Sequence, residues 1–287
     1  MILSQGVHFA LLSMLFAGIN DVIFKKYAMK NRSRGMYVLG VGFTWAMLQL
    51  LYSSFSRISF SFDIQTIQYG LLAGIILAAA NISLIVGLAH IDVSLGSTVY
   101  RLNTIGVVIL SYVFLSEGIE FIKLTGITFG IIAVLLLYKS NNSKTANHTA
   151  KIFFWLVVFA SLLRAAYGVV SRIGLVASAD KNAIILLAAI CWIFGGAFYA
   201  KYVEKRFIVT KKKALYSAVS GVLVFFIVNF LILGLQIAQA SIVVPIANMS
   251  FIIALLISVL IGTEKMDFKK IVATAFAAGS IVLLSSV

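Results

Sequence analysis

Asp21, Arg101 and Arg164 lie deep within long apolar stretches of the 287-residue chain. Ionisable residues inside a membrane segment face the protein interior or a water-filled cavity, which makes them functional candidates. Arginine presents a planar fork of donors that suits a carboxylate or a phosphate better than lysine does. We therefore expect Arg101 and Arg164 to bind an anionic group of a ligand. Snorkelling toward the membrane surface and pairing inside the protein are the alternatives.

Asp21 lies deeper within an apolar stretch than the other carboxylates of the chain. This position favours a role in coupling to a proton or another cation. Lys25 follows four residues later, with the acid N-terminal, which is the favourable order for an ion pair along a helix. Pairing of Asp21 with Lys25, or with the two arginines in a structural triad, explains its presence equally well.

Amide and tyrosine side chains accompany the charged residues in the same apolar stretches. Asn229 and Asn248 are expected to line one cavity, although hydrogen bonds between helices explain buried amides equally well. The full set of candidate substrate-binding residues is Arg101, Arg164, Asn20, Tyr167, Asn229, Asn248, Tyr100 and Asn103.

Other residues in these stretches favour structural roles. Trp45 and Trp192 are expected to pack, because both stand in unbroken apolar sequence. Glu117 and Glu264 end apolar stretches just before a new helix, which favours bracing or capping of a hairpin. Pro245 removes a backbone donor and predicts a kink.

The composition excludes a soluble domain. The chain is 62% hydrophobic and 11% charged, with a mean hydropathy of +1.08, whereas soluble domains carry about one-quarter charged residues. The net charge of +14 is spread over short clusters between apolar runs, which fits loops facing anionic lipid and not nucleic acid. No phosphate-binding loop, protease motif or cysteine and histidine cluster is present, so we expect neither an enzyme nor a bound cofactor or metal.

Ten apolar runs are long enough to cross a hydrocarbon core about 30 Å thick. The sequence therefore predicts an all-α integral membrane protein. The runs lie at residues 7–27, 36–55, 67–89, 94–115, 121–138, 152–175, 182–201, 214–237, 241–262 and 268–286.

The two halves of the chain overlay without a gap at an offset of 147 residues, which places Trp45 on Trp192 and Glu117 on Glu264. An odd number of spans in each copy makes the second copy cross the membrane in the opposite sense, as in the inverted repeats of transporters. The predicted organisation is a first five-helix repeat at 1–138, a polar linker at 139–151 and a second five-helix repeat at 152–287.

Lysine and arginine residues concentrate in the loops after odd-numbered spans. Since such loops favour the cytoplasmic side, the count predicts both termini outside. The short loops and the absence of a recognisable targeting signal favour a prokaryotic plasma membrane.

The chain resembles the ten-span EamA-like branch of the drug/metabolite transporter superfamily over nearly its whole length. In the first span Gly18, Asn20 and Lys25 match a pattern of that branch, whereas Ala17 stands where members carry tryptophan. The fourth and ninth spans keep the branch's terminal glutamate, in Leu115-Ser116-Glu117 and Gly262-Thr263-Glu264. The prolines common in those spans are replaced by Thr104 and Phe251.

The resemblance implies a central cavity lined by the first, third, fourth, sixth, eighth and ninth helices, and transport of amino acids or other small metabolites. It also implies cytoplasmic termini, in conflict with the loop charges. We expect a secondary transporter of a small polar metabolite, an amino acid or organic anion, that works by alternating access. Its partners would be a small-molecule substrate, membrane lipids and a coupling proton or cation. A flippase for lipid-linked sugars or polyprenyl phosphates, and a membrane scaffold that does not transport, are the alternatives.

Overall fold

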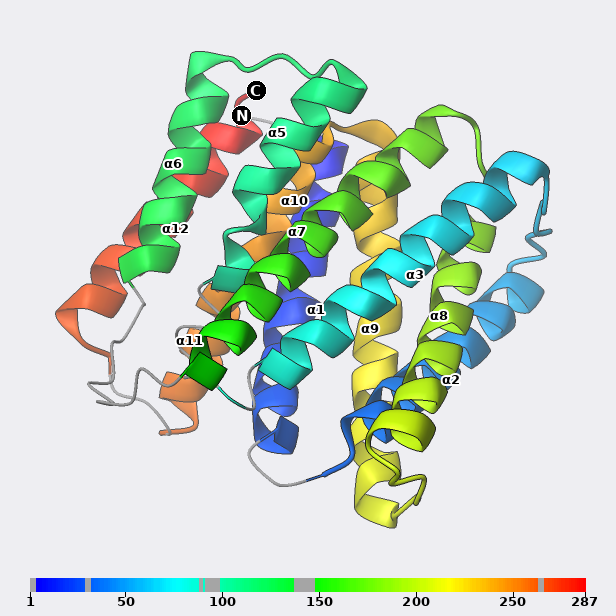
Figure 1. Ribbon diagram of the computed structural model, residues 1–287. Helices are drawn as coiled ribbons and strands as arrows, with labels where there is room; N and C mark the ends of the chain where they lie inside the picture. The colour runs from blue at the N-terminus through cyan, green and yellow to red at the C-terminus, as the bar shows by residue number, and fades with distance from the viewer. Residues whose placement is uncertain (1–3, 29–31, 88–89, 91–98, 137–147, 263–265) are drawn as a thin grey trace.

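The computed structural model describes residues 4–28, 32–87, 90, 99–136, 148–262 and 266–287 (Figure 1). Eight helices within these ranges have the length and hydropathy of membrane spans, and two shorter apolar helices cover Val99–Leu115 and Phe121–Leu136. The predicted all-helical fold with ten spans is confirmed. The helices of the first half are α1 (Gln5–Ala28), α2 (Arg34–Phe55), α3 (Ile64–Gly87), α5 (Asn103–Leu115) and α6 (Phe121–Leu136). Those of the second half are α7 (His148–Val176), α8 (Lys181–Phe198), α9 (Lys211–Ile237), α10 (Ala240–Asn248), α11 (Ser250–Leu260) and α12 (Phe268–Ser285).

Two parts of the sequence prediction fall at the limits of the description. Residues 139–147 of the predicted linker and Glu264 lie outside the described residues, as does the side chain of Lys25. Helix α7 begins at His148, inside the segment expected to be linker.

Helices of the two halves begin at equivalent positions. Ser33 and Asp180, which are 147 residues apart, each accept a hydrogen bond from the backbone N–H three residues later and cap α2 and α8. Asp63 and Thr210, again 147 apart, accept the same bond at the starts of α3 and α9. A side-chain acceptor at this position satisfies one of the free N–H groups of a helix start. The caps are consistent with two copies of one five-helix unit.

The contacts between the two halves of the chain are related by a pseudo-two-fold axis. Helix α1 packs on α9 as α7 packs on α3, while α2 packs on its own equivalent α8, and α6 on α12. Figure 1 shows α1 and α7 running in opposite directions, as inverted repeats require. Trp45 and Trp192 meet edge to face at 5.9 Å between ring centroids, on the contact between α2 and α8. This packing matches the expectation for both tryptophans.

The closest approach of α2 and α8 depends on glycine. A Cβ atom on Gly196 would lie 2.4 Å from the backbone nitrogen of Leu39, and one on Gly35 would lie 2.4 Å from that of Ala200. Real Cβ atoms do not approach backbone so closely, so the crossing requires residues without side chains.

The fourth and ninth spans are each broken at one residue, Leu102 and Met249, which are 147 residues apart. Each donates its N–H to the carbonyl three residues earlier, at 3.2 Å for Leu102 and 3.0 Å for Met249. Each also accepts from the N–H three residues later, at 3.0 Å. The chain contains a single proline, Pro245, and α10 continues through it to Asn248. The break of the ninth span thus lies four residues after Pro245, where the kink was expected, and the equivalent break at Leu102 forms without a proline.

Candidate functional site

A cavity of about 180 Å³ lies beside the two helix breaks. The six helices expected to contribute to its wall all do so, and α2 and α8 contribute as well. Six of the predicted site residues line it: Asn20, Asp21, Tyr100, Arg101, Arg164 and Asn248. The remaining wall is mainly apolar, with Leu77, Leu84, Ile85, Val224, Ile227 and Val228.

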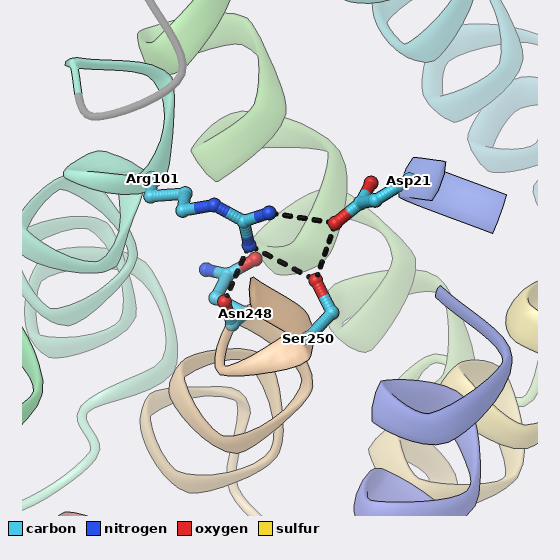
Figure 2. Close-up of polar contacts among 4 residues, drawn as sticks. All are labelled: Asp21, Arg101, Asn248 and Ser250. Atoms are coloured by element: carbon cyan, nitrogen blue, oxygen red, sulfur yellow. Dashed lines mark hydrogen bonds and ion pairs between the residues drawn. The ribbon is translucent and has the colours of Figure 1, made fainter. Parts of the chain in front are cut away.

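Arg101 is held by three groups of the protein (Figure 2). Its Nη2 donates to Asp21 Oδ2 at 2.6 Å, and its Nη1 donates to the carbonyl of Asn248 at 2.8 Å and to Ser250 Oγ at 2.9 Å. Ser250 Oγ donates in turn to Asp21 Oδ2 at 3.1 Å. The side chain of Arg101 is 18% exposed and that of Asp21 is 38% exposed. Asp21 is therefore paired with one of the two arginines, Arg101. The side chain of Lys25, the other expected partner, lies outside the described residues.

The repeat explains why these residues meet. Arg101 and Asn248 are equivalent at the offset of 147, as are Asn103 and Ser250, and equivalent residues meet only near the symmetry axis. The bond from Arg101 to Ser250 has its symmetry mate in the bond from Asn248 Nδ2 to Asn103 Oδ1, at 2.5 Å. The helix breaks also leave the carbonyl of Asn248 without a partner in α10, so it can accept from Arg101.

Arg164 lies on α7, at the wall of the cavity, with a half-buried side chain. Its guanidinium carbon is 5.2 Å from the centre of the Tyr167 ring. Among the residues that the structure describes, Arg164 makes no hydrogen bond or ion pair. A guanidinium group in a confined space attracts anions strongly, because little water competes for it. Arg164, unlike Arg101, can therefore receive an anion without first giving up a partner.

Three of the predicted site residues do not line the cavity. Asn229 donates to Gln49 Oε1 at 2.9 Å and to the carbonyl of Phe225 at 2.8 Å, so its side chain joins α9 to α2. Tyr167 is buried beneath Arg164, and Asn103 is buried where it accepts from Asn248. The expectation that Asn229 and Asn248 line one cavity is wrong, because the side chain of Asn229 is turned toward a neighbouring helix.

The cavity wall also contains residues that were not predicted to lie there, namely Asn81, Ser250, Tyr37 and Trp192, the last of which was expected only to pack. Ser250 could have been found as the repeat equivalent of Asn103. Asn81 is an amide within an apolar run, the same signal that selected the other asparagines. Tyr37 and Trp192 carry no such signal, because aromatic residues that pack and those that line cavities look alike in sequence.

Comparison with known proteins tests these interpretations. The model of the EamA-like transporter family matches residues 4–139 and 151–286, two segments that begin and end 147 residues apart. The chain belongs to the EamA-like transporter family. It is thus an integral membrane transporter with a small-molecule substrate, and not an enzyme. The resemblance to this family is confirmed.

A solved crystal structure, described only as that of a protein, has the same fold as this transporter. It superposes with a TM-score of 0.81 over 98% of this chain and 98% of its own length, at 10% sequence identity. No curated protein matches the chain significantly. The family therefore establishes transport, and the substrate has to be inferred from the cavity.

Proposed function

We propose that this transporter is a secondary transporter of a small polar metabolite that carries an anionic group, an amino acid or an organic anion. It would work by alternating access around the cavity at the helix breaks. The observation that supports the proposal best is Arg164, which lies at the cavity wall with no acidic partner in the part of the chain that the structure describes, while Asp21 is bound to Arg101. Two guanidinium groups and one carboxylate leave the cavity with one excess positive charge, which favours an anion.

The size of the cavity supports a metabolite of few atoms. Its volume of about 180 Å³ is below the roughly 300–1,000 Å³ typical of sites for drug-sized ligands. A lipid-linked sugar would not fit without a large opening between helices. Asn20 lines the cavity, and its Oδ1 atom has no hydrogen-bond partner among the described residues, so it is our candidate acceptor for an ammonium or hydroxyl group of the substrate. We assign Asn20, Asn81 and Tyr100 to orientation of the substrate and Arg164 to its anionic group.

Asp21 is our candidate for coupling. A substrate anion that draws Arg101 toward itself would leave Asp21 with one hydrogen-bond partner among the described side chains, the hydroxyl of Ser250. An unpaired carboxylate within a membrane protein is unfavourable, and uptake of a proton removes its charge. Once Arg101 has moved, the oxygens of Asp21, Asn248 and Ser250 that it occupied are free to take up a proton or another cation, so Asp21 could couple transport to either.

We place the transporter in a prokaryotic plasma membrane. The connection between α8 and α9, with Lys205 and Arg206, would face the cytoplasm, because lysine and arginine concentrate in the loops that follow odd-numbered spans. Proteolysis of this connection in sealed vesicles of known orientation tests the placement.

The substrate class can be tested by thermal denaturation of the purified protein with amino acids, organic acids, sugar phosphates and polyprenyl phosphate. A ligand at 100 times its Kd stabilises the folded state by about 2.7 kcal/mol, which is readily measured as a rise in Tm. We expect a carboxylate metabolite to raise the Tm of the wild type but not of Arg164→Ala. Uptake of the same metabolite into proteoliposomes then distinguishes transport from binding.

The matched control is Arg172→Ala. Arg172 lies on the same helix, α7, and donates to the carbonyls of Leu235 and Gln236 away from the cavity wall. This variant should lose stability but keep the ligand-dependent rise in Tm. A rise that survives in Arg164→Ala would refute the assignment. Stabilisation by polyprenyl phosphate alone would favour a flippase, and binding without uptake would favour a scaffold.

A further inference from the structure

We infer that α10 is a separately held half-helix and that Glu117 is the positioning residue that anchors it, while Arg101 latches its other end at the cavity. Occupation of the cavity by an anion would release the latch and leave the anchor in place. The inference rests on the proposed function only for the identity of the releasing ligand. The two attachments themselves follow from the contacts of α10.

The anchor is at the N-terminus of α10. The Glu117 carboxylate accepts from the backbone N–H of Ala240 at 2.8 Å and from that of Ser241 at 3.0 Å, and also from the Ser241 hydroxyl. Glu117 is buried, and bonds from N–H groups to a buried carboxylate are among the strong hydrogen bonds of proteins. The capping role predicted for Glu117 is confirmed, but the helix that it caps belongs to the other half of the chain.

A second side chain strengthens the anchor. Lys123, which is buried on α6, donates to the carbonyl of Gly118 at 2.6 Å and to Oε1 of Gln239. Gln239 is the residue that precedes α10. The hairpin between α5 and α6 thus holds the start of α10 through both Glu117 and Lys123.

The latch is at the C-terminus of α10. There the carbonyl of Asn248 accepts from Arg101 at 2.8 Å. The helix continues into α11 only after the break at Met249. Arg101 is also the partner of Asp21, and both Arg101 and Asn248 line the cavity. This end is therefore held by a residue that a ligand can reach.

The charges of the two attachments match the dipole of α10. A helix carries partial positive charge at its N-terminus and partial negative charge at its C-terminus. Glu117 and Arg101 lie just beyond opposite ends of α5, which packs against α10. A carboxylate at one end and a guanidinium at the other therefore bind α10 as a unit. Glu117 is buried, whereas Arg101 lines the cavity and can be reached by a ligand. The N-terminus of α10 is therefore the fixed end, and the C-terminus is the end that moves.

Hydrogen exchange followed by mass spectrometry can test this division in detergent without any ligand. Glu117→Gln should speed exchange of the first amides of α10, at Ala240 and Ser241, by about tenfold, as for the loss of one charge-assisted hydrogen bond. Arg101→Gln should instead speed exchange around Asn248 and Met249. Ser241→Ala, which removes only the hydroxyl bond, should act in the same direction as Glu117→Gln with a smaller effect. It also provides a test if Glu117→Gln does not fold.

The control is Asp180→Asn, which weakens a carboxylate cap of the same kind on α8. It should leave exchange throughout α10 unchanged. Equal acceleration along α10 and α11 in both Glu117→Gln and Arg101→Gln, or no acceleration in either, would overturn the inference, because α10 would then not be held separately at its two ends.

A second arm compares sodium acetate with sodium chloride at equal ionic strength, with acetate as the smallest stable carboxylate probe. Acetate should speed exchange at Asn248 and Met249 by several-fold in the wild type and not in Arg101→Gln. If Glu117→Gln and Arg101→Gln speed exchange at opposite ends of α10 and acetate has no effect, the roles of Glu117 and Arg101 are supported. The proposal of an anionic substrate is then refuted. If acetate speeds exchange but the two variants do not act at opposite ends of α10, the anionic substrate class is supported. The role of Glu117 as the anchor of α10 is then refuted.

Discussion

The ion pair between Asp21 and Arg101 can be measured by a double-mutant cycle of Asp21→Asn and Arg101→Gln. The two side chains meet at 2.6 Å, with exposed fractions of 38% and 18%. Exposed ion pairs contribute about 0.2–1 kcal/mol, whereas removing one partner of a buried pair costs about 3–5 kcal/mol. For this half-buried pair, discounted for the water that reaches Asp21, we expect a coupling free energy of about 1–2 kcal/mol.

The two single variants should differ. In Asp21→Asn, Arg101 keeps the carbonyl of Asn248 and the hydroxyl of Ser250 as acceptors. In Arg101→Gln, the Ser250 hydroxyl is the one partner that the Asp21 carboxylate keeps among the described residues. A charge that loses its strongest partner is more costly than a cation that retains two acceptors, so Arg101→Gln should lower the free energy of unfolding more, by about 2–3 kcal/mol against about 1 kcal/mol.

Equilibrium unfolding in mixed micelles of SDS provides the assay. Trp45 and Trp192 report on it directly, because their buried rings meet at the packing of α2 on α8. Coupling within about 0.5 kcal/mol of zero, the usual error of additivity for independent sites, would show that the pair does not form in the solubilised protein. Greater destabilisation by Asp21→Asn than by Arg101→Gln would refute the reasoning about remaining acceptors.

Two further outcomes test the fold. Gly196→Ala should destabilise the transporter by about 1–3 kcal/mol in the same unfolding assay, because the added Cβ atom would lie 2.4 Å from the backbone of α2. Gly118→Ala, where no atom lies within 4 Å of the added Cβ, is the control and should be tolerated. Hydrogen bonds from Thr66, first among them that from its backbone N–H, lower the pKa of the Asp63 carboxyl below its ordinary value. The charged cap therefore stabilises the fold above the pKa of Asp63 in the unfolded chain, and this stabilisation is lost as the pH falls through the lower pKa of the folded state. The difference in Tm between wild type and Asp63→Asn should therefore be present at pH 6 and vanish at low pH; a difference that persists in acid would contradict the role of the charged cap.

The fold could be predicted from sequence because the two patterns that indicate it, the apolar runs and the internal repeat, each extend over many residues. Each apolar run requires about 20 residues, so isolated polar residues such as Asp21 do not conceal it. The repeat is carried by many positions at one offset, among which the tryptophans and glutamates are too rare to coincide often by chance. The position of the helix breaks was not predictable in this way. At Leu102 no proline or glycine marks the break, and in the ninth span the proline lies four residues from it.

The site was predictable in its charges and less so in its amides. A buried charge in a membrane protein has few tolerable environments, which is why Asp21, Arg101 and Arg164 all reach one cavity. An amide such as Asn229 can satisfy itself on a neighbouring helix at no such cost, so its position in an apolar run does not reveal which way it points. Knowledge of the symmetry would have helped, because residues near the axis, such as Arg101 and Asn248, meet their own equivalents.

None of the three charged residues of the site has a charged equivalent: Asp21 and Arg101 lie in the first copy and Arg164 in the second. The equivalents of Asp21, Arg101 and Arg164 are Gly168, Asn248 and Ala17. Because Arg101 lies against its own equivalent, a second arginine at that position would bring two guanidinium groups into contact, with like-charge repulsion in a half-buried space. Where one copy carries a charged residue next to the axis, the other copy must therefore carry an uncharged residue at the equivalent position. The same geometry lets one set of charges interact with both halves, as the proposed alternating access around a single binding site would require.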